Sequence, residues 1–96
     1  MVEINWTNRA LNDIDAIAVF ISQNSEVYSI IQTQRFFSAV QILTTHSFAG
    51  RIVPEKNNKK IREIILGNYR MIYKIINKNR IDIITIHHSA MRLRKM

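Results

Sequence analysis

The fold is decided by the stretch Ile61-Arg-Glu-Ile-Ile-Leu-Gly-Asn-Tyr-Arg-Met-Ile-Tyr-Lys-Ile-Ile-Asn-Lys-Asn-Arg-Ile-Asp-Ile-Ile-Thr-Ile-His-His-Ser89. It is rich in β-branched and aromatic residues and is interrupted by two turn signals, Gly67-Asn68 and Asn77-Lys78-Asn79. These features predict three consecutive antiparallel strands. Because glycine accepts a positive φ at the first position of a two-residue turn, Gly67-Asn68 also predicts the register of the first hairpin.

The predicted register, with a three-residue second turn, divides the strands into two faces, because opposed residues point to the same side of a sheet. The opposed pairs are Leu66–Tyr69, Ile64–Met71, Arg62–Tyr73, Ile75–Ile81, Lys74–Asp82, Tyr73–Ile83 and Tyr69–His87. We expect the face with these tyrosines to be the core. The other face is mixed and is expected to be partly solvated; it holds Glu63, Arg70, Lys74, Asp82 and His88 among Ile61, Ile65, Ile72, Ile84 and Ile86.

Length and composition indicate one domain over residues 1–96, since 47% hydrophobic residues suffice for one modest core. No apolar run approaches the roughly 18 residues that span a bilayer, and no signal segment precedes the domain, so we expect a cytoplasmic protein without a membrane partner. The absence of cysteine excludes disulfides and thiolate ligands.

Charge is concentrated in the second half of the chain. The net charge is +7, and of the 14 Lys and Arg residues only Arg9 and Arg35 precede residue 50. A positive field on this scale attracts phosphates or an acidic protein, although it also serves solubility alone.

The first half reads as a short strand and two helices. Val2 to Trp6, with apolar Val2, Ile4 and Trp6, could form a first strand, and Thr7 is a candidate N-cap. Apolar residues recur at helical spacing from Asn8 to about Gln23. Ser25 can cap a second helix that runs to about Thr45. Residues 46–60 contain Gly, Pro and a polar, basic run, which predicts a loop. The resulting order is β-α-α-β-β-β, an α+β domain with an antiparallel sheet and two helices packed on one face.

The second helix is apolar on two sides. Val27, Ile30 and Ile31 lie on one side, and Phe36, Ala39, Val40 and Leu43 lie roughly opposite. A helix of this kind is covered on both sides. We favour cover from helix one and the sheet over cover from a partner.

Several segments together resemble the RelE/ParE superfamily of bacterial toxins. They are Trp6, Gly50-Arg-Ile-Val-Pro-Glu55, Ile61-Arg-Glu63, Gly67-Asn-Tyr-Arg-Met-Ile-Tyr73 and Ile83-Ile-Thr-Ile-His-His-Ser-Ala90. The resemblance implies a growth-arresting toxin of a type II toxin–antitoxin module, neutralised by an antitoxin whose C-terminal segment wraps it. For a basic toxin we expect an acidic antitoxin, and no cofactor is implied.

The superfamily has two target classes, and the framework from Arg62 to Tyr73, with its His-x-Ala ending, looks more like the ParE-type members that inhibit DNA gyrase. The alternative is a ribosome-dependent mRNA endoribonuclease of the RelE/YoeB kind. By resemblance, its catalytic residues would be Glu55, Arg70 and His88. RNA cleavage needs a base, a cation to stabilise the phosphorane and an acid, which these residue types can supply.

Other arginines are candidates for contact with phosphate or with the target: Arg51, Arg62, Arg92 and Arg94. The tail departs from the ParE-like pattern, because Met91 stands where Arg usually follows the alanine. Arg70 could instead have a structural role by pairing diagonally with Glu63. His87 and His88 are adjacent on a strand and point to opposite faces, which argues against a metal site. A nucleic-acid-binding module without toxicity is a third, less favoured function.

Overall fold

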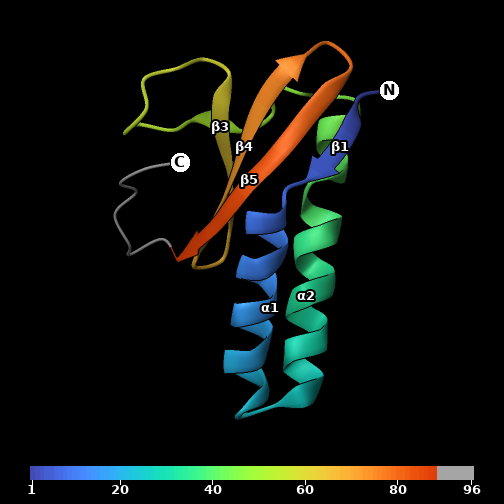
Figure 1. Ribbon diagram of the computed structural model, residues 1–96, viewed down its shortest axis with the longest axis vertical. Helices are drawn as coiled ribbons and strands as arrows, with labels where there is room; N and C mark the ends of the chain where they lie inside the picture. The colour runs from blue at the N-terminus through green and yellow to red at the C-terminus, as the bar shows by residue number, and fades with distance from the viewer. Residues whose placement is uncertain (89–96) are drawn as a thin grey trace.

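The computed structural model describes residues 1–88, in which five strands form one sheet and two helices cover one of its faces (Figure 1). The sheet order is β1-β5-β4-β3-β2. The elements are β1 (Glu3–Trp6), α1 (Asn8–Ser22), α2 (Glu26–Ala39), a 3-10 helix η1 (Gln41–Thr44), β2 (Arg51–Ile52), β3 (Ile61–Leu66), β4 (Tyr69–Asn77) and β5 (Arg80–His88).

Both helices begin where the capping residues predict. The Thr7 hydroxyl accepts a hydrogen bond from the Ala10 amide, and the Ser25 hydroxyl accepts one from Tyr28, so each satisfies a first-turn N–H. Helix α1 ends at Ser22, close to the predicted end. The second helix is shorter than predicted, because α2 stops at Ala39 and the chain continues as the separate turn of η1.

The sheet is mixed rather than antiparallel throughout, which corrects the prediction. Strand β1 pairs with β5 in parallel, and the Thr7 amide and hydroxyl extend this pairing by donating to the Ile83 carbonyl. The predicted loop also contains a two-residue strand, β2, which pairs antiparallel with β3 and places Arg51 opposite Glu63. The order of elements therefore has one strand more than predicted.

The first hairpin has the predicted register, with Leu66 opposite Tyr69 and Gly67 at a φ of +58°. In the second hairpin the predicted pairs Ile75–Ile81, Lys74–Asp82 and Tyr73–Ile83 also form. Its turn differs from the prediction, since Asn77 pairs with Arg80 and Ile76 is left out of the ladder.

The predicted pairing of Tyr69 with His87 is wrong. The register shifts between Ile72 and Tyr73 of β4, because Ile72 pairs with Thr85 whereas Tyr73 pairs with Ile83. Ile84 is the extra residue of a β-bulge, and every later residue of β5 changes face. Tyr69 therefore lies opposite His88, and Arg70 lies opposite His87.

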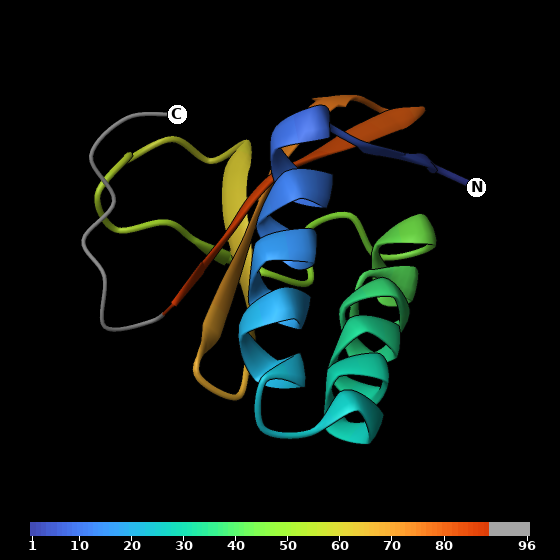
Figure 2. The ribbon, with the colours of Figure 1, turned by 60° about the horizontal axis from the view of Figure 1, so that its bottom comes forward.

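The main core lies between the sheet and the helices. Both helices lie on the same face of the sheet (Figure 2). It includes the predicted Met71, Tyr73 and Ile83, together with Ile86, which the bulge moves to this face. A smaller cluster of Val53 and Ile72 lies on the other face. Neither the length nor the hydrophobicity that a membrane-spanning helix needs is reached by any helix within residues 1–88.

The helices project past the end of the sheet (Figure 1) and leave apolar side chains exposed. On α2, the side with Phe36 is buried, as is the C-cap residue Val40, but Val27 and Ile30 remain 69% and 60% exposed. Internal cover of both sides, the favoured expectation, is therefore wrong. The exposed apolar helix surface comprises Val19, Phe20, Val27, Tyr28, Ile30 and Ile31.

Candidate functional site

Four charged side chains form a continuous ion-pair network on the sheet face away from the helices. Nε of Arg70 donates to Glu63 at 2.6 Å, while its Nη1 and Nη2 donate to the two carboxylate oxygens of Glu55 at 2.7 and 2.8 Å. Nε of Arg51 donates to the other Glu63 oxygen. The network of Arg51, Glu55, Glu63 and Arg70 thus contains two cations and two anions.

Strand register brings three members of the network together. Arg51 of β2 lies opposite Glu63 of β3, and Arg70 of β4 lies opposite Ile65, two residues along β3 on the same face. The diagonal Arg70–Glu63 pair is the structural alternative considered for Arg70, and it is confirmed.

Glu55 comes to the network from a loop. The amides of Lys56 and Asn57 both donate to the Val53 carbonyl, and Asn57 has a positive φ of 46°, so the chain turns sharply after Val53. Val53 is completely buried against Ile72 and anchors this turn on the sheet. The carboxylate of Glu55 consequently faces the Arg70 guanidinium.

Burial makes the network a fixed unit. The Glu63 side chain is completely buried and that of Arg70 is 8% exposed, whereas that of Glu55 is 31% exposed. A buried carboxylate is tolerated only when cations and hydrogen bonds compensate for lost solvation. The hydrogen bond to Glu55, with that to Glu63, raises the pKa of Arg70. All three guanidinium nitrogens are thereby engaged.

Arg62 lies outside the network and organises the neighbouring loop. Its Nε donates to the Lys59 carbonyl at 2.8 Å and its Nη1 to the Gly50 carbonyl at 2.9 Å. The guanidinium also stacks 4.8 Å from the centre of the Phe48 ring. These contacts tie both ends of residues 48–59 to β3.

The Tyr73 hydroxyl fixes the segment before β2. It donates to the Ser47 carbonyl at 2.8 Å and accepts from the Gly50 amide at 3.0 Å. Burial raises the pKa of Tyr73, so the hydroxyl keeps its proton and remains a donor. Sequence reasoning identified Tyr73 as a core residue but missed this role.

The two histidines lie in different surroundings. His88 is exposed at the end of β5 and packs edge-on against Tyr69, with ring centres 5.8 Å apart. His87 shares a face with Arg70, and its Nδ1 is buried without a hydrogen-bond partner among residues 1–88. Burial, followed by the charge of Arg9, lowers the pKa of His87.

Asp13 makes a further, partly buried contact that the sequence did not reveal. Strand β1 ends opposite Ile83, so the β5 edge beyond it has no neighbouring strand. The Asp13 carboxylate of α1 takes that place by accepting from the Ile86 amide and from the Thr85 hydroxyl, just after the bulge. A helical carboxylate thus replaces a missing strand and attaches α1 to the sheet.

The structure therefore joins two of the three nuclease candidates. Glu55 and Arg70 are paired, but the bulge places His88 on the opposite face from Arg70. Of the other arginines, Arg51 belongs to the network and Arg62 to the loop, while Arg92 and Arg94 lie outside the described residues. Within residues 1–88, no group of three His, Asp or Glu side chains is arranged to hold a metal ion.

Comparisons with known proteins agree with this fold. The model of a family described as the ParE toxin of the type II toxin–antitoxin system parDE matches residues 4–93. The solved structure of a chromosomal ParDE toxin–antitoxin system from P. aeruginosa is similar, with a TM-score of 0.74 and 21% identity, over 92% of this chain and 96% of that one. A search of curated protein sequences gives no match.

Proposed function

We propose that this chain, which belongs to the ParE toxin family, arrests growth by binding and inhibiting DNA gyrase in the cytoplasm. It is the toxin component of a type II toxin–antitoxin system, and its partner is an antitoxin. The resemblance of residues 62–73 to ParE-type members supports gyrase as the target. Inhibition of this kind requires a binding surface and no reacting groups.

The ion-pair network of Arg51, Glu55, Glu63 and Arg70 is the observation that favours inhibition by binding over RNA cleavage. A cation that stabilises a phosphorane must direct N–H groups at the phosphate oxygens. Arg70 directs three of its five N–H groups, one from each guanidinium nitrogen, at Glu55 or Glu63 instead. With His88 on the other face, the same residues favour a structural role over RNA cleavage.

The basic half of the sheet is the proposed gyrase-binding surface. The exposed cations on its strands, and on the loop and turn next to them, are Arg51, Lys59, Lys60, Lys74, Lys78 and Arg80. Arg92 and Arg94 extend this set along the sequence, and we propose them as further contacts. Clustered positive charge accelerates encounter with an acidic protein surface and helps to orient the complex.

The exposed apolar helix surface is the proposed site of antitoxin binding. Large apolar side chains exposed on two neighbouring helices mark an interaction site, and the antitoxin is the partner that the module supplies. We propose an acidic antitoxin, because the toxin carries a net charge of +7.

A supercoiling assay tests the target. Purified protein should prevent purified gyrase from supercoiling a relaxed plasmid. Lys59→Glu should weaken inhibition about threefold to tenfold, since rim charges act mainly on association. Arg35→Glu changes the net charge equally but on α2, and it should leave inhibition unchanged. Undiminished supercoiling with the unaltered protein would refute the proposal.

A further inference from the structure

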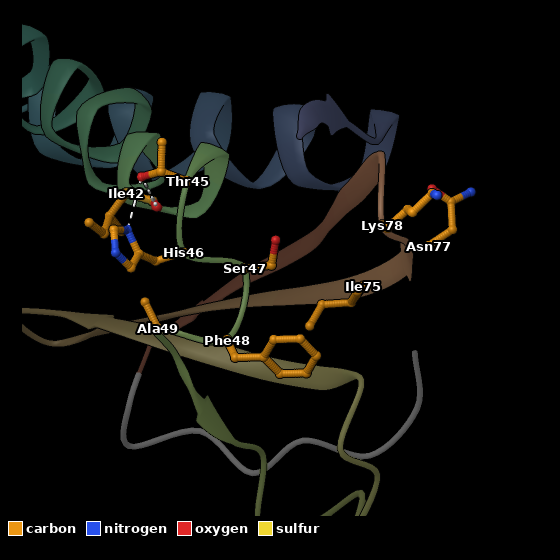
Figure 3. Close-up of a pocket in the computed structure, with 9 residues that line it drawn as sticks. All are labelled: Ile42, Thr45, His46, Ser47, Phe48, Ala49, Ile75, Asn77 and Lys78. Carbon is orange, nitrogen blue, oxygen red and sulfur yellow. Dashed lines mark hydrogen bonds between the residues drawn. The ribbon is translucent and has the colours of Figure 1, made fainter. Parts of the chain in front are cut away.

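A preformed apolar groove lies away from both the ion-pair network and the exposed apolar helix surface. It has a volume of about 660 Å³ and lies between η1 with the segment after it and the β4–β5 turn (Figure 3). The lining residues include Ile42, Ser47, Phe48, Ala49, Ile75 and Lys78. Its size is within the range that accepts a large side chain.

The groove exposes apolar surface although its walls are held in place. Ile42 and Phe48 are 49% and 60% exposed, whereas Ile75 at the base belongs to the main core. The wall from Ser47 to Gly50 is fixed by the Tyr73 hydroxyl. An incoming apolar side chain would therefore contact the core directly, with little ordering cost to the groove itself.

The rim of the groove is cationic. Lys78 lines it, and the Arg62 guanidinium is stacked on the Phe48 ring. Among the described residues, no Asp or Glu lines the groove. An apolar floor beside cations matches a segment that combines a bulky apolar side chain with carboxylates.

We propose that this groove binds an acidic segment of the antitoxin through one large apolar side chain, flanked by carboxylates that pair with Lys78 and Arg62. A second copy of this chain is a poor occupant, because it has a net charge of +7 and would bring further positive charge to the cationic rim. The proposal rests on membership of the toxin family and not on gyrase as the target. Failure of the supercoiling test would leave it standing.

The test is an amide NMR titration of the full chain with the peptide acetyl-Glu-Glu-Phe-Glu-Glu-amide. Shift changes should centre on Phe48, Ala49 and Ile75. Replacing the peptide phenylalanine by alanine should weaken binding about tenfold or more, because burial of the ring is lost. A peptide with lysine in place of glutamate should bind at least about tenfold more weakly.

Variants of the protein locate the site. Ala49→Trp fills the groove and should weaken binding about tenfold, and Lys78→Glu should weaken it about threefold to tenfold, with Arg35→Glu as the charge-matched control. If Ala49→Trp loses its dispersed spectrum, Lys78→Glu decides the test. Shifts confined to α1 and α2, shifts spread over all cations, or concentration-dependent shifts without peptide would each overturn the proposal.

Discussion

Arg70 and Glu55 form a bidentate pair, with Nη1 and Nη2 of the guanidinium 2.7 and 2.8 Å from the two carboxylate oxygens. The remaining nitrogen, Nε, donates to the buried carboxylate of Glu63. Glu55 and Glu63 thus enclose one arginine, Arg70. The loop that carries Glu55 is attached to the sheet through the Arg70 side chain. We propose that these charged side chains, which resemble a nuclease centre, serve to hold the fold together.

Glu63→Gln should be strongly destabilising. The substitution keeps the shape of the side chain but leaves Arg51 and Arg70 without their shared anion. Breaking a buried ion pair from one side costs about 3–5 kcal/mol. Urea unfolding measures the change, with Glu55→Gln as the matched control. Because the Glu55 side chain is partly exposed, Glu55→Gln should lower the free energy of unfolding clearly less than Glu63→Gln does. Equal urea midpoints for Glu63→Gln and the unaltered protein would contradict the structural role.

Gly50→Ala should destabilise the fold by crowding. A Cβ at Gly50 would lie 2.6 Å from the Glu63 carbonyl oxygen and 2.7 Å from a ring carbon of Tyr73. Overpacking of this kind costs about 1–3 kcal/mol. Thermal unfolding measures the loss. Gly67→Ala separates steric from conformational cost, because it meets nothing within 4 Å but has a φ of +58°. It should lose about 1–2 kcal/mol through backbone strain alone.

Tyr73→Phe should loosen the segment before β2. The variant removes the donor to Ser47 and the acceptor for Gly50 while keeping the ring. Leaving these buried backbone groups unsatisfied costs about 1–3 kcal/mol. Hydrogen exchange at Gly50 should accelerate together with the fall in the free energy of unfolding. Tyr28→Phe, at a half-exposed position, serves as the control. Unchanged exchange at Gly50 would count against the hydroxyl's role.

Stability should fall as the pH decreases below about 6.5, the ordinary pKa of histidine, because the pKa of His87 is lowered in the folded state. At a pH between the lowered pKa of His87 in the folded state and its ordinary pKa in the unfolded state, the unfolded chain binds the proton and the folded chain does not. Stability is therefore lost as the pH falls. The charged groups that act on the ring, besides its burial, are Arg9, Asp13, Arg70 and Glu55.

Unfolding free energies measured from pH 8 to pH 5 test this dependence. His87→Gln should flatten the curve over that window, whereas His46→Gln, at an exposed position, should leave it unchanged. An identical slope for His87→Gln and the unaltered protein would show that another group is responsible.

Local signals in the sequence predicted the helix starts and the first hairpin. Thr7 and Ser25 cap first turns through their own hydroxyls, and Gly67 accepts a positive φ, so each effect is confined to neighbouring residues. Strand pairs close to a turn depend on the same local signals. The pairs Arg62–Tyr73 of the first hairpin and Ile75–Ile81 of the second were therefore predicted correctly.

The bulge at Ile84 could not be predicted, because it has no local signal in the sequence and the side chain that is hydrogen-bonded beside it is distant in the chain. Asp13 accepts hydrogen bonds from Thr85 and Ile86, more than 70 positions later, and Ile84 itself is an ordinary strand residue. The bulge exchanged the faces of His87 and His88, so the histidine on the same face as Arg70 is His87 and not the predicted His88. Parallel pairing of β1 with β5 is likewise a long-range contact without a local signature.

Supercoiling by purified gyrase, measured with the unaltered protein and with His88→Ala, distinguishes a binding inhibitor from a nuclease. If the protein inhibits by binding and His88 takes no part in chemistry, both proteins should block supercoiling. Their half-inhibitory concentrations should lie within about twofold of each other, which is a difference in binding free energy of less than about 0.5 kcal/mol. Supercoiling that proceeds undiminished with the unaltered protein, while mRNA on translating ribosomes is cleaved by it and not by His88→Ala, would contradict the account.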